Sequence, residues 1–143
     1  MKKYIVIACV AFLFASCEEW TPEYKIIGSW KLNRVYLNDQ EIAADSTDVY
    51  ANRSGAFYTF LPDPVMEVTV LINGMARDSY RGTYKMLKKK KHGKTNILEV
   101  DFLLVDRIYK YSADIEKLNR NELRYSYTDE ENNHWRLEFS SYY

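Results

Sequence analysis

The chain has 143 residues, with 20 Lys or Arg and 20 Asp or Glu, so its formal net charge at pH 7 is zero. This balance does not suggest a nucleic-acid-binding domain, whose usual mark is a strongly basic face. The length suits one domain with a substantial core.

The first segment has the pattern of a secretory signal peptide. Lys2 and Lys3 precede a twelve-residue apolar run over 4–15, which Ser16 and Cys17 follow. A membrane-spanning helix needs about 20 apolar residues, so the run predicts a cleaved signal over 1–16 instead. Cleavage removes two basic residues and leaves 18 against 20 acidic ones, a net charge of −2.

Residues 14–17, Phe-Ala-Ser-Cys, resemble the lipobox of bacterial lipoproteins, with Phe in place of the more usual Leu. The resemblance implies that Cys17 becomes the first residue and carries fatty acyl chains such as palmitate. Two or three chains hold a protein at a membrane durably, whereas one does not. Because the other cysteine, Cys9, leaves with the signal, we expect no disulfide, thiol nucleophile or cysteine metal site.

Residues 17–25 are polar and are expected to form a tether that the lipobox resemblance implies is lipidated, and residues 26–143 are expected to form the folded domain. Glu18 and Glu19 resemble the acidic export signal of some lipoproteins of the Bacteroidetes type, although a solvated tether would have the same composition.

From residue 26 onward apolar and polar residues alternate with a period of two, which indicates strands. Asn73-Gly74 is the strongest hairpin turn signal. Eight strands joined in sequence order predict an all-β, antiparallel up-and-down barrel, with a two-sheet sandwich as the alternative. The long loop 38–55 could hold a short helix. The predicted strands are 26–37, 56–61, 65–72, 75–87, 96–104, 107–117, 122–128 and 134–141.

Gly28-Ser29-Trp30 at the head of the first strand is similar to the Gly-x-Trp signature of lipocalins. With the lipobox, Tyr58-Thr59-Phe60 and the strand–turn–strand of 115–123, the chain resembles the lipocalin-like lipoproteins of Bacteroidetes-type bacteria. The resemblance implies that Gly28 and Trp30 close one end of the barrel, with Trp30 beneath an Arg from a late strand. Arg124 and Arg136 are the candidates, but both fall on the polar phase of their strands.

Many aromatic residues fall on the inward phase and are candidates for lining a ligand site. A barrel of this size is either filled by side chains or holds one small ligand, and the sequence leaves both open. A pocket lined this way would be apolar with phenol donors, suited to a fatty, aromatic or mixed-polarity molecule. These candidates are Tyr58, Phe60, Tyr80, Tyr84, Tyr109, Tyr111, Tyr125 and Tyr127.

Two loop motifs suggest further contacts. Residues 88–94 contain five lysines and His92, which fits a solvated hairpin loop or a contact with anionic head groups. Asp45-Ser46-Thr47 resembles an O-glycosylation signal of Bacteroidetes-type bacteria, so Ser46 is a candidate glycosylation site.

The sequence contains no motif that predicts catalysis. His92 and His134 lack metal-binding spacing, and no Gly-x-Ser-x-Gly elbow or phosphate loop is present. Asp101 could pair with Glu99 or Asp106, but surface carboxylates fit the same pattern. We therefore predict a protein that is not an enzyme and needs no cofactor or metal.

These patterns predict a lipid-anchored, lipocalin-like protein at the outer membrane, on its periplasmic or surface face. It would bind a small, largely apolar molecule and no nucleic acid. One alternative is a plugged barrel that serves as an accessory subunit of an outer-membrane complex, docking through the outward-phase Leu61, Leu71 and Leu103. Another is an enzyme inhibitor acting through loop 38–55.

Overall fold

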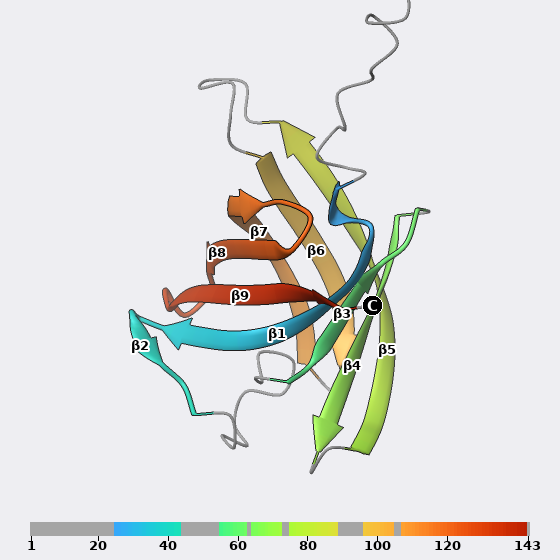
Figure 1. Ribbon diagram of the computed structural model, residues 1–143. Helices are drawn as coiled ribbons and strands as arrows, with labels where there is room; N and C mark the ends of the chain where they lie inside the picture. The colour runs from blue at the N-terminus through green and yellow to red at the C-terminus, as the bar shows by residue number, and fades with distance from the viewer. Residues whose placement is uncertain are drawn as a thin grey trace, which may run out of the picture.

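The computed structural model describes residues 25–43, 55–62, 64–72, 75–88, 96–104 and 107–142. They form nine antiparallel strands in the sheet order β2-β1-β3-β4-β5-β6-β7-β8-β9. β1 also pairs with β9, so the sheet closes on itself and the predicted barrel is confirmed over the sandwich (Figure 1). The strands are β1 Gly28–Leu37, β2 Gln40–Glu41, β3 Phe57–Phe60, β4 Val65–Ile72, β5 Met75–Lys88, β6 Asn96–Leu104, β7 Arg107–Leu118, β8 Glu122–Thr128 and β9 His134–Tyr142.

Each of the eight predicted strands is present, and the structure adds the short β2. Asn38 and Asp39 have φ values of 50° and 66°, as a two-residue hairpin turn with both central residues left-handed requires. The chain therefore reverses, and Gln40 and Glu41 pair back onto Leu37 and Tyr36. The prediction that residue 38 begins the long loop was therefore wrong, because Asn38 and Asp39, two residue types that adopt positive φ readily, form a hairpin turn.

The two ends of the barrel are named here after their tryptophans. The Trp30 end holds the start of β1 and the β7–β8 turn, where Asn119 Oδ1 accepts hydrogen bonds from the backbone N–H groups of Asn121 and Glu122, each at 2.9 Å. The Trp135 end holds the β4–β5 hairpin and the β8–β9 loop. Trp135 lies opposite Leu37, seven positions beyond Trp30, so the backbone positions of the two tryptophans are about 23 Å apart along β1.

Three β-bulges interrupt the regular alternation of the strands. At the register shifts Asn33 in β1, Arg77 in β5 and Glu116 in β7 are the extra residues, so the bulged strand has one residue more than its neighbour there. In β1 the extra residue lets Leu32 and Val35 both point inward although they are three positions apart. A bulge thus places two consecutive side chains on the outer face and bends the strand.

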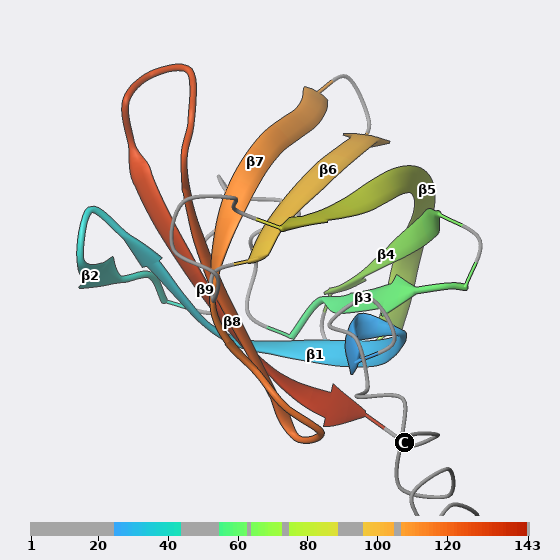
Figure 2. The same ribbon diagram turned by 90° about the horizontal axis from the view of Figure 1, so that it is seen from above.

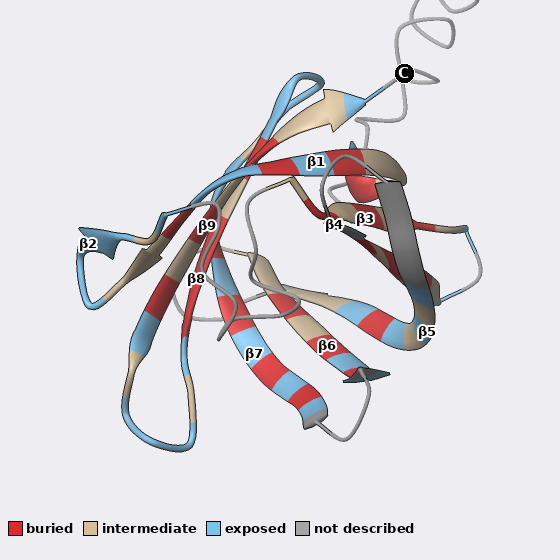
Figure 3. Cartoon of the chain, turned by 90° about the horizontal axis from the view of Figure 1, so that it is seen from below, coloured by how far each residue is buried: buried red, intermediate tan, exposed pale blue. Residues whose placement is uncertain are grey.

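The interior is filled by apolar and aromatic side chains, which produce the alternating buried and exposed stripes of Figure 3. β5 pairs with both β4 and β6 around Gly82, which lies opposite Met66 and Phe102, and the strand curves strongly along its length (Figure 2). A Cβ at Gly82 would lie 2.3 Å from Phe102 Cβ and 2.4 Å from the Asp101 carbonyl oxygen. Only glycine allows the two backbones to approach this closely.

Candidate functional site at the Trp135 end

Parallel aromatic rings from three consecutive strands line the Trp135 end. Tyr111 of β7 stacks on Tyr127 of β8 with centroids 3.7 Å apart and ring planes 5° apart, and Tyr127 stacks on Trp135 of β9 at 6.5 Å. Tyr109 stacks on Phe102 at 4.9 Å. We call Tyr109, Tyr111, Tyr127 and Trp135 the aromatic ladder. Its members retain 6–9% exposure, whereas Tyr58 and Tyr125, deeper in the barrel, retain none.

The ladder rings also form part of the barrel wall. β7 pairs with β8 over Asp114–Leu118, and among the described residues the stretch Arg107–Ala113 has no strand partner on that side. β7 and the β8–β9 hairpin diverge there (Figure 2). We call this unpaired boundary between β7 and β8 the seam. The stacked Tyr111 and Tyr127 rings bridge the seam, in place of backbone hydrogen bonds.

Phenol hydroxyls provide polar groups within this apolar region. The Tyr111 and Tyr125 hydroxyls form a buried hydrogen bond of 2.9 Å. Burial raises the pKa values of Tyr58, Tyr111 and Tyr125 well above the ordinary value of about 10. These groups stay neutral at any physiological pH and can both donate and accept.

Asp129 fixes the orientation of the Trp135 ring. Its Oδ2 accepts a 2.9 Å hydrogen bond from Trp135 Nε1, and its Oδ1 accepts bonds from the backbone N–H groups of Glu131 and Asn133. Burial by itself would raise the pKa of Asp129, but these hydrogen bonds together lower it. The carboxylate is thus ionised at neutral pH, when it holds both the β8–β9 loop and the indole.

The predicted ligand-lining residues do not gather in one place. Seven of the eight are buried in the interior, and Tyr80 is half-buried against it. Tyr109, Tyr111 and Tyr127 belong to the ladder, whereas Phe60 and Tyr84 lie together nearer the Trp30 end, with ring centroids 4.9 Å apart. Trp135 and Asp129 were not among the predicted site residues, although the inward phase of Trp135 in the alternation of residues 134–139 indicates that its ring faces the interior.

At the other end, Trp30 is a buried plug that retains 2% exposure. Its Nε1 donates a 2.7 Å hydrogen bond to the Ile26 carbonyl oxygen, across Gly28, whose φ is 131°. Arg124 and Arg136 both pair with Glu138, and Arg136 covers the Tyr36 ring at 4.2 Å. The implied Arg over Trp30 is therefore supplied by neither candidate, because both project from the outer phase of their strands.

Several predicted features lie outside the described residues. These are Cys17, Ser46, His92, Asp106, most of the lysine-rich loop and most of loop 38–55. Leu71 is described by its backbone alone, while Leu61 is half-buried and Leu103 is 56% exposed.

Of the polar residues considered for chemistry, Glu99 and Asp101 are two positions apart on β6 and so share its outer face. His134 is exposed, and its backbone N–H donates to Asn38 Oδ1. Asp101 is exposed with Lys110 Nζ at 4.0 Å. Within the described ranges, no three His, Cys, Asp or Glu side chains gather as metal ligands would, and no helix there is long and apolar enough to cross a membrane.

Comparison with known proteins does not assign this chain to a family, so its class is defined by its fold. No protein-family model matches the sequence, and no curated protein matches it significantly. The structure defines an all-β barrel compatible with lipocalin-like ligand binding.

Proposed function

We propose that this chain is a lipid-anchored, lipocalin-like protein of the outer membrane that binds a small, flat, largely apolar molecule and does not catalyse a reaction. The observation that carries the binding proposal is the aromatic ladder at the Trp135 end. The lipobox ending at Cys17 supports the membrane anchor.

The chemistry of the ladder suits this ligand class. Offset-stacked aromatic rings contribute about 0.5–1.5 kcal/mol beyond the area that they bury. The described residues below the ladder form one packed apolar cluster, so the ligand would lie against the ladder and the seam between β7 and β8. There it would stack on Trp135 and hydrogen-bond to a phenol hydroxyl.

Fluorescence can test this site because the two described tryptophans report on opposite ends. In a Trp20→Phe background, retinol is titrated as a flat apolar probe and palmitate as a flexible one. Bound retinol should accept energy from Trp135, so the quenching should fall sharply in a further Trp135→Phe variant. The matched Trp30→Phe variant should retain it. Equal quenching in both variants would disprove binding at the Trp135 end.

The anchor is tested separately with Cys17→Ala. In cells, this change should abolish incorporation of radiolabelled palmitate and release the chain from the membrane fraction. If the unsubstituted chain incorporates no label and is recovered in the soluble fraction, the anchor proposal is wrong.

One observation favours a second function, as an accessory subunit of an envelope complex. Leu103 and Ile108 lie directly opposite each other on β6 and β7 and are 56% and 69% exposed. They adjoin the stretch Arg107–Ala113 of β7, which has no described partner strand on its β8 side, and an added strand from another protein could pair there. Native mass spectrometry of the protein extracted from its own membrane separates the two functions. A small-molecule adduct supports the binding protein, and a co-purifying protein lost in Ile108→Lys supports the subunit.

A further inference from the structure

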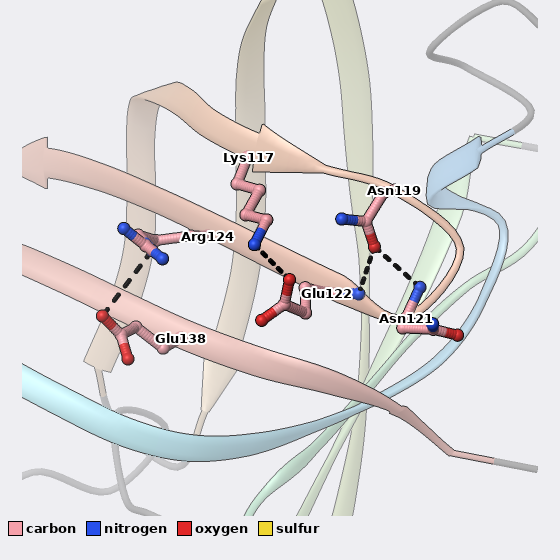
Figure 4. A network of polar contacts seen from close by, with 6 residues as sticks. All are labelled: Lys117, Asn119, Asn121, Glu122, Arg124 and Glu138. Carbon is pink, nitrogen blue, oxygen red and sulfur yellow. Dashed lines mark hydrogen bonds and ion pairs between the residues drawn. The ribbon is translucent and has the colours of Figure 1, made fainter.

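The outer face of the barrel carries a polar hollow that takes no part in the proposed ligand binding at the Trp135 end. The hollow has a volume of about 160 Å³ and is lined by charged and neutral polar residues. It spans four neighbouring strands, β7, β8, β9 and β1, on the face opposite the interior core (Figure 4).

A row of four charged residues crosses this hollow in register. Lys117 lies opposite Arg124, Arg124 opposite Glu138, and Glu138 opposite Arg34. We call these four residues the charged row. The bulges at Asn33 and Glu116 produce the alignment, because each shifts its strand by one residue immediately before Arg34 or Lys117. Bulges often re-aim side chains at functional sites.

The charges in the row do not balance. It contains three cations and one carboxylate, and it places Lys117 directly opposite Arg124, although like charges in cross-strand pairs are destabilising. Glu122 compensates in part through its ion pair with Lys117 (Figure 4). Three cations against two carboxylates leave the lining with a net charge of +1.

The Glu138 carboxylate lies between the guanidinium groups of Arg124 and Arg136 and forms a close hydrogen bond with neither of them. Its Oε1 lies 3.6 Å from Arg124 Nε and 3.7 Å from Arg136 Nε, both longer than a hydrogen bond. Arg136 Nε is buried and has no hydrogen-bond partner among the described residues. A buried donor without a partner is destabilising, so a second anion beside Arg124 would let Glu138 move toward Arg136.

Neutral polar groups complete the hollow on the β1 and β9 side. Asn33 Nδ2 donates a 2.9 Å hydrogen bond to Ser140 Oγ, and both residues line the hollow. An amide, a hydroxyl and a carboxylate suit hydroxyl groups, whereas guanidinium groups suit a carboxylate in bidentate geometry. We infer that this hollow binds an acidic sugar, with its carboxylate at Arg124 and Arg34 and its hydroxyl groups at Glu138, Asn33 and Ser140.

The test is isothermal titration of the full-length chain in detergent with three probes: glucuronate, its neutral parent glucose, and acetate. Glucuronate should bind most tightly, because only this probe combines the carboxylate and the hydroxyl groups. Arg124→Gln and Arg34→Gln should each weaken glucuronate binding at least about tenfold, as expected for the loss of a charged hydrogen-bond donor. The matched control Arg81→Gln removes an exposed outer-face Arg that pairs with Glu67 far from the hollow, and it should leave binding unchanged.

Glu138→Gln distinguishes sugar recognition from simple anion attraction. Removing this carboxylate makes the row more positive, so acetate binding should strengthen while glucuronate loses its preference over acetate. The inference is overturned if glucuronate does not bind, if it binds no better than acetate, or if Arg81→Gln weakens binding as much as Arg124→Gln. Circular dichroism checks that each variant is folded, and Lys117→Gln replaces any variant that is not.

Discussion

The inner and outer faces of β7, β8, β9 and β1 differ in the chemistry of their side chains, although the same strands form both. Inside, Tyr111, Tyr127 and Trp135 stack in an apolar environment. Outside, Lys117, Arg124, Glu138 and Arg34 form a solvated row with unbalanced charge. The inner face determines stability because its groups lose water on folding, whereas exposed ion pairs contribute about 0–1 kcal/mol each. We therefore expect substitutions inside to change stability and substitutions outside to change recognition.

The largest effect should come from Gly82→Ala. A methyl group there would overlap Phe102 Cβ and the Asp101 carbonyl oxygen, and the backbones of β5 and β6 would have to separate. We expect the free energy of unfolding to fall by about 3 kcal/mol or more, as measured by urea denaturation. Thr83→Ala, at the next, exposed position, should change it by less than about 0.5 kcal/mol. Similar values for both variants would contradict the packing described for β5.

Alkaline pH should also act through the inner face. Because burial raises the pKa values of Tyr58, Tyr111 and Tyr125, the unfolded chain ionises first, near pH 10. Stability is fully present below about pH 10 and falls above it, by up to about 1.4 kcal/mol per pH unit for each tyrosine. Urea midpoints measured from pH 8 to pH 12 should decline steeply above pH 10. A flat profile would mean that water reaches these hydroxyls.

Removing the hydrogen bond between the Tyr111 and Tyr125 hydroxyls should lower the free energy of unfolding by less than Gly82→Ala does. Tyr125→Phe leaves the Tyr111 hydroxyl with one buried partner fewer, and we expect a loss of about 1–2 kcal/mol. The double variant Tyr111→Phe/Tyr125→Phe should lose clearly less than the sum of the single variants, because no unpaired hydroxyl remains. Strict additivity in this double-mutant cycle would show that the bond contributes nothing.

A smaller effect is expected at the edge between the two faces, from Asp129→Asn. The amide oxygen can still accept from the loop N–H groups, but its NH₂ cannot accept from Trp135 Nε1. Stability should fall by about 1 kcal/mol, and Trp135 fluorescence should shift as the indole reorients. Because hydrogen bonds lower the pKa of Asp129, its contribution is present above about pH 4 and is lost as the pH falls further. An unchanged emission spectrum would contradict the positioning role.

The smallest effect on stability should come from Arg124→Gln on the outer face. Its ion pair with Glu138 is long and solvated, so thermal denaturation should show a change of less than about 0.5 kcal/mol. A loss of several kcal/mol would make the charged row a structural element and remove the contrast between the faces.

The positions and number of the main strands were readable in the sequence because inward residues recur with period two, as in His134–Phe139, and Asn73-Gly74 marks a turn. The inward phase of the tyrosines was readable for the same reason. The local pattern of the sequence is enough to predict the strands and their inward side chains, since an inward residue is apolar whichever strand lies beside it.

Tertiary structure decided the features that depend on pairing between strands. The bulges at Asn33 and Glu116 are shifts relative to a partner strand, so no local pattern in β1 or β7 reveals them. The stacking of Tyr111 on Tyr127, the closure of β1 on β9 and the need for glycine at Gly82 likewise arise from residues distant in sequence. The sequence by itself determined which side chains face inward, whereas only the closed barrel determined which of them meet and which charges align across its outer face.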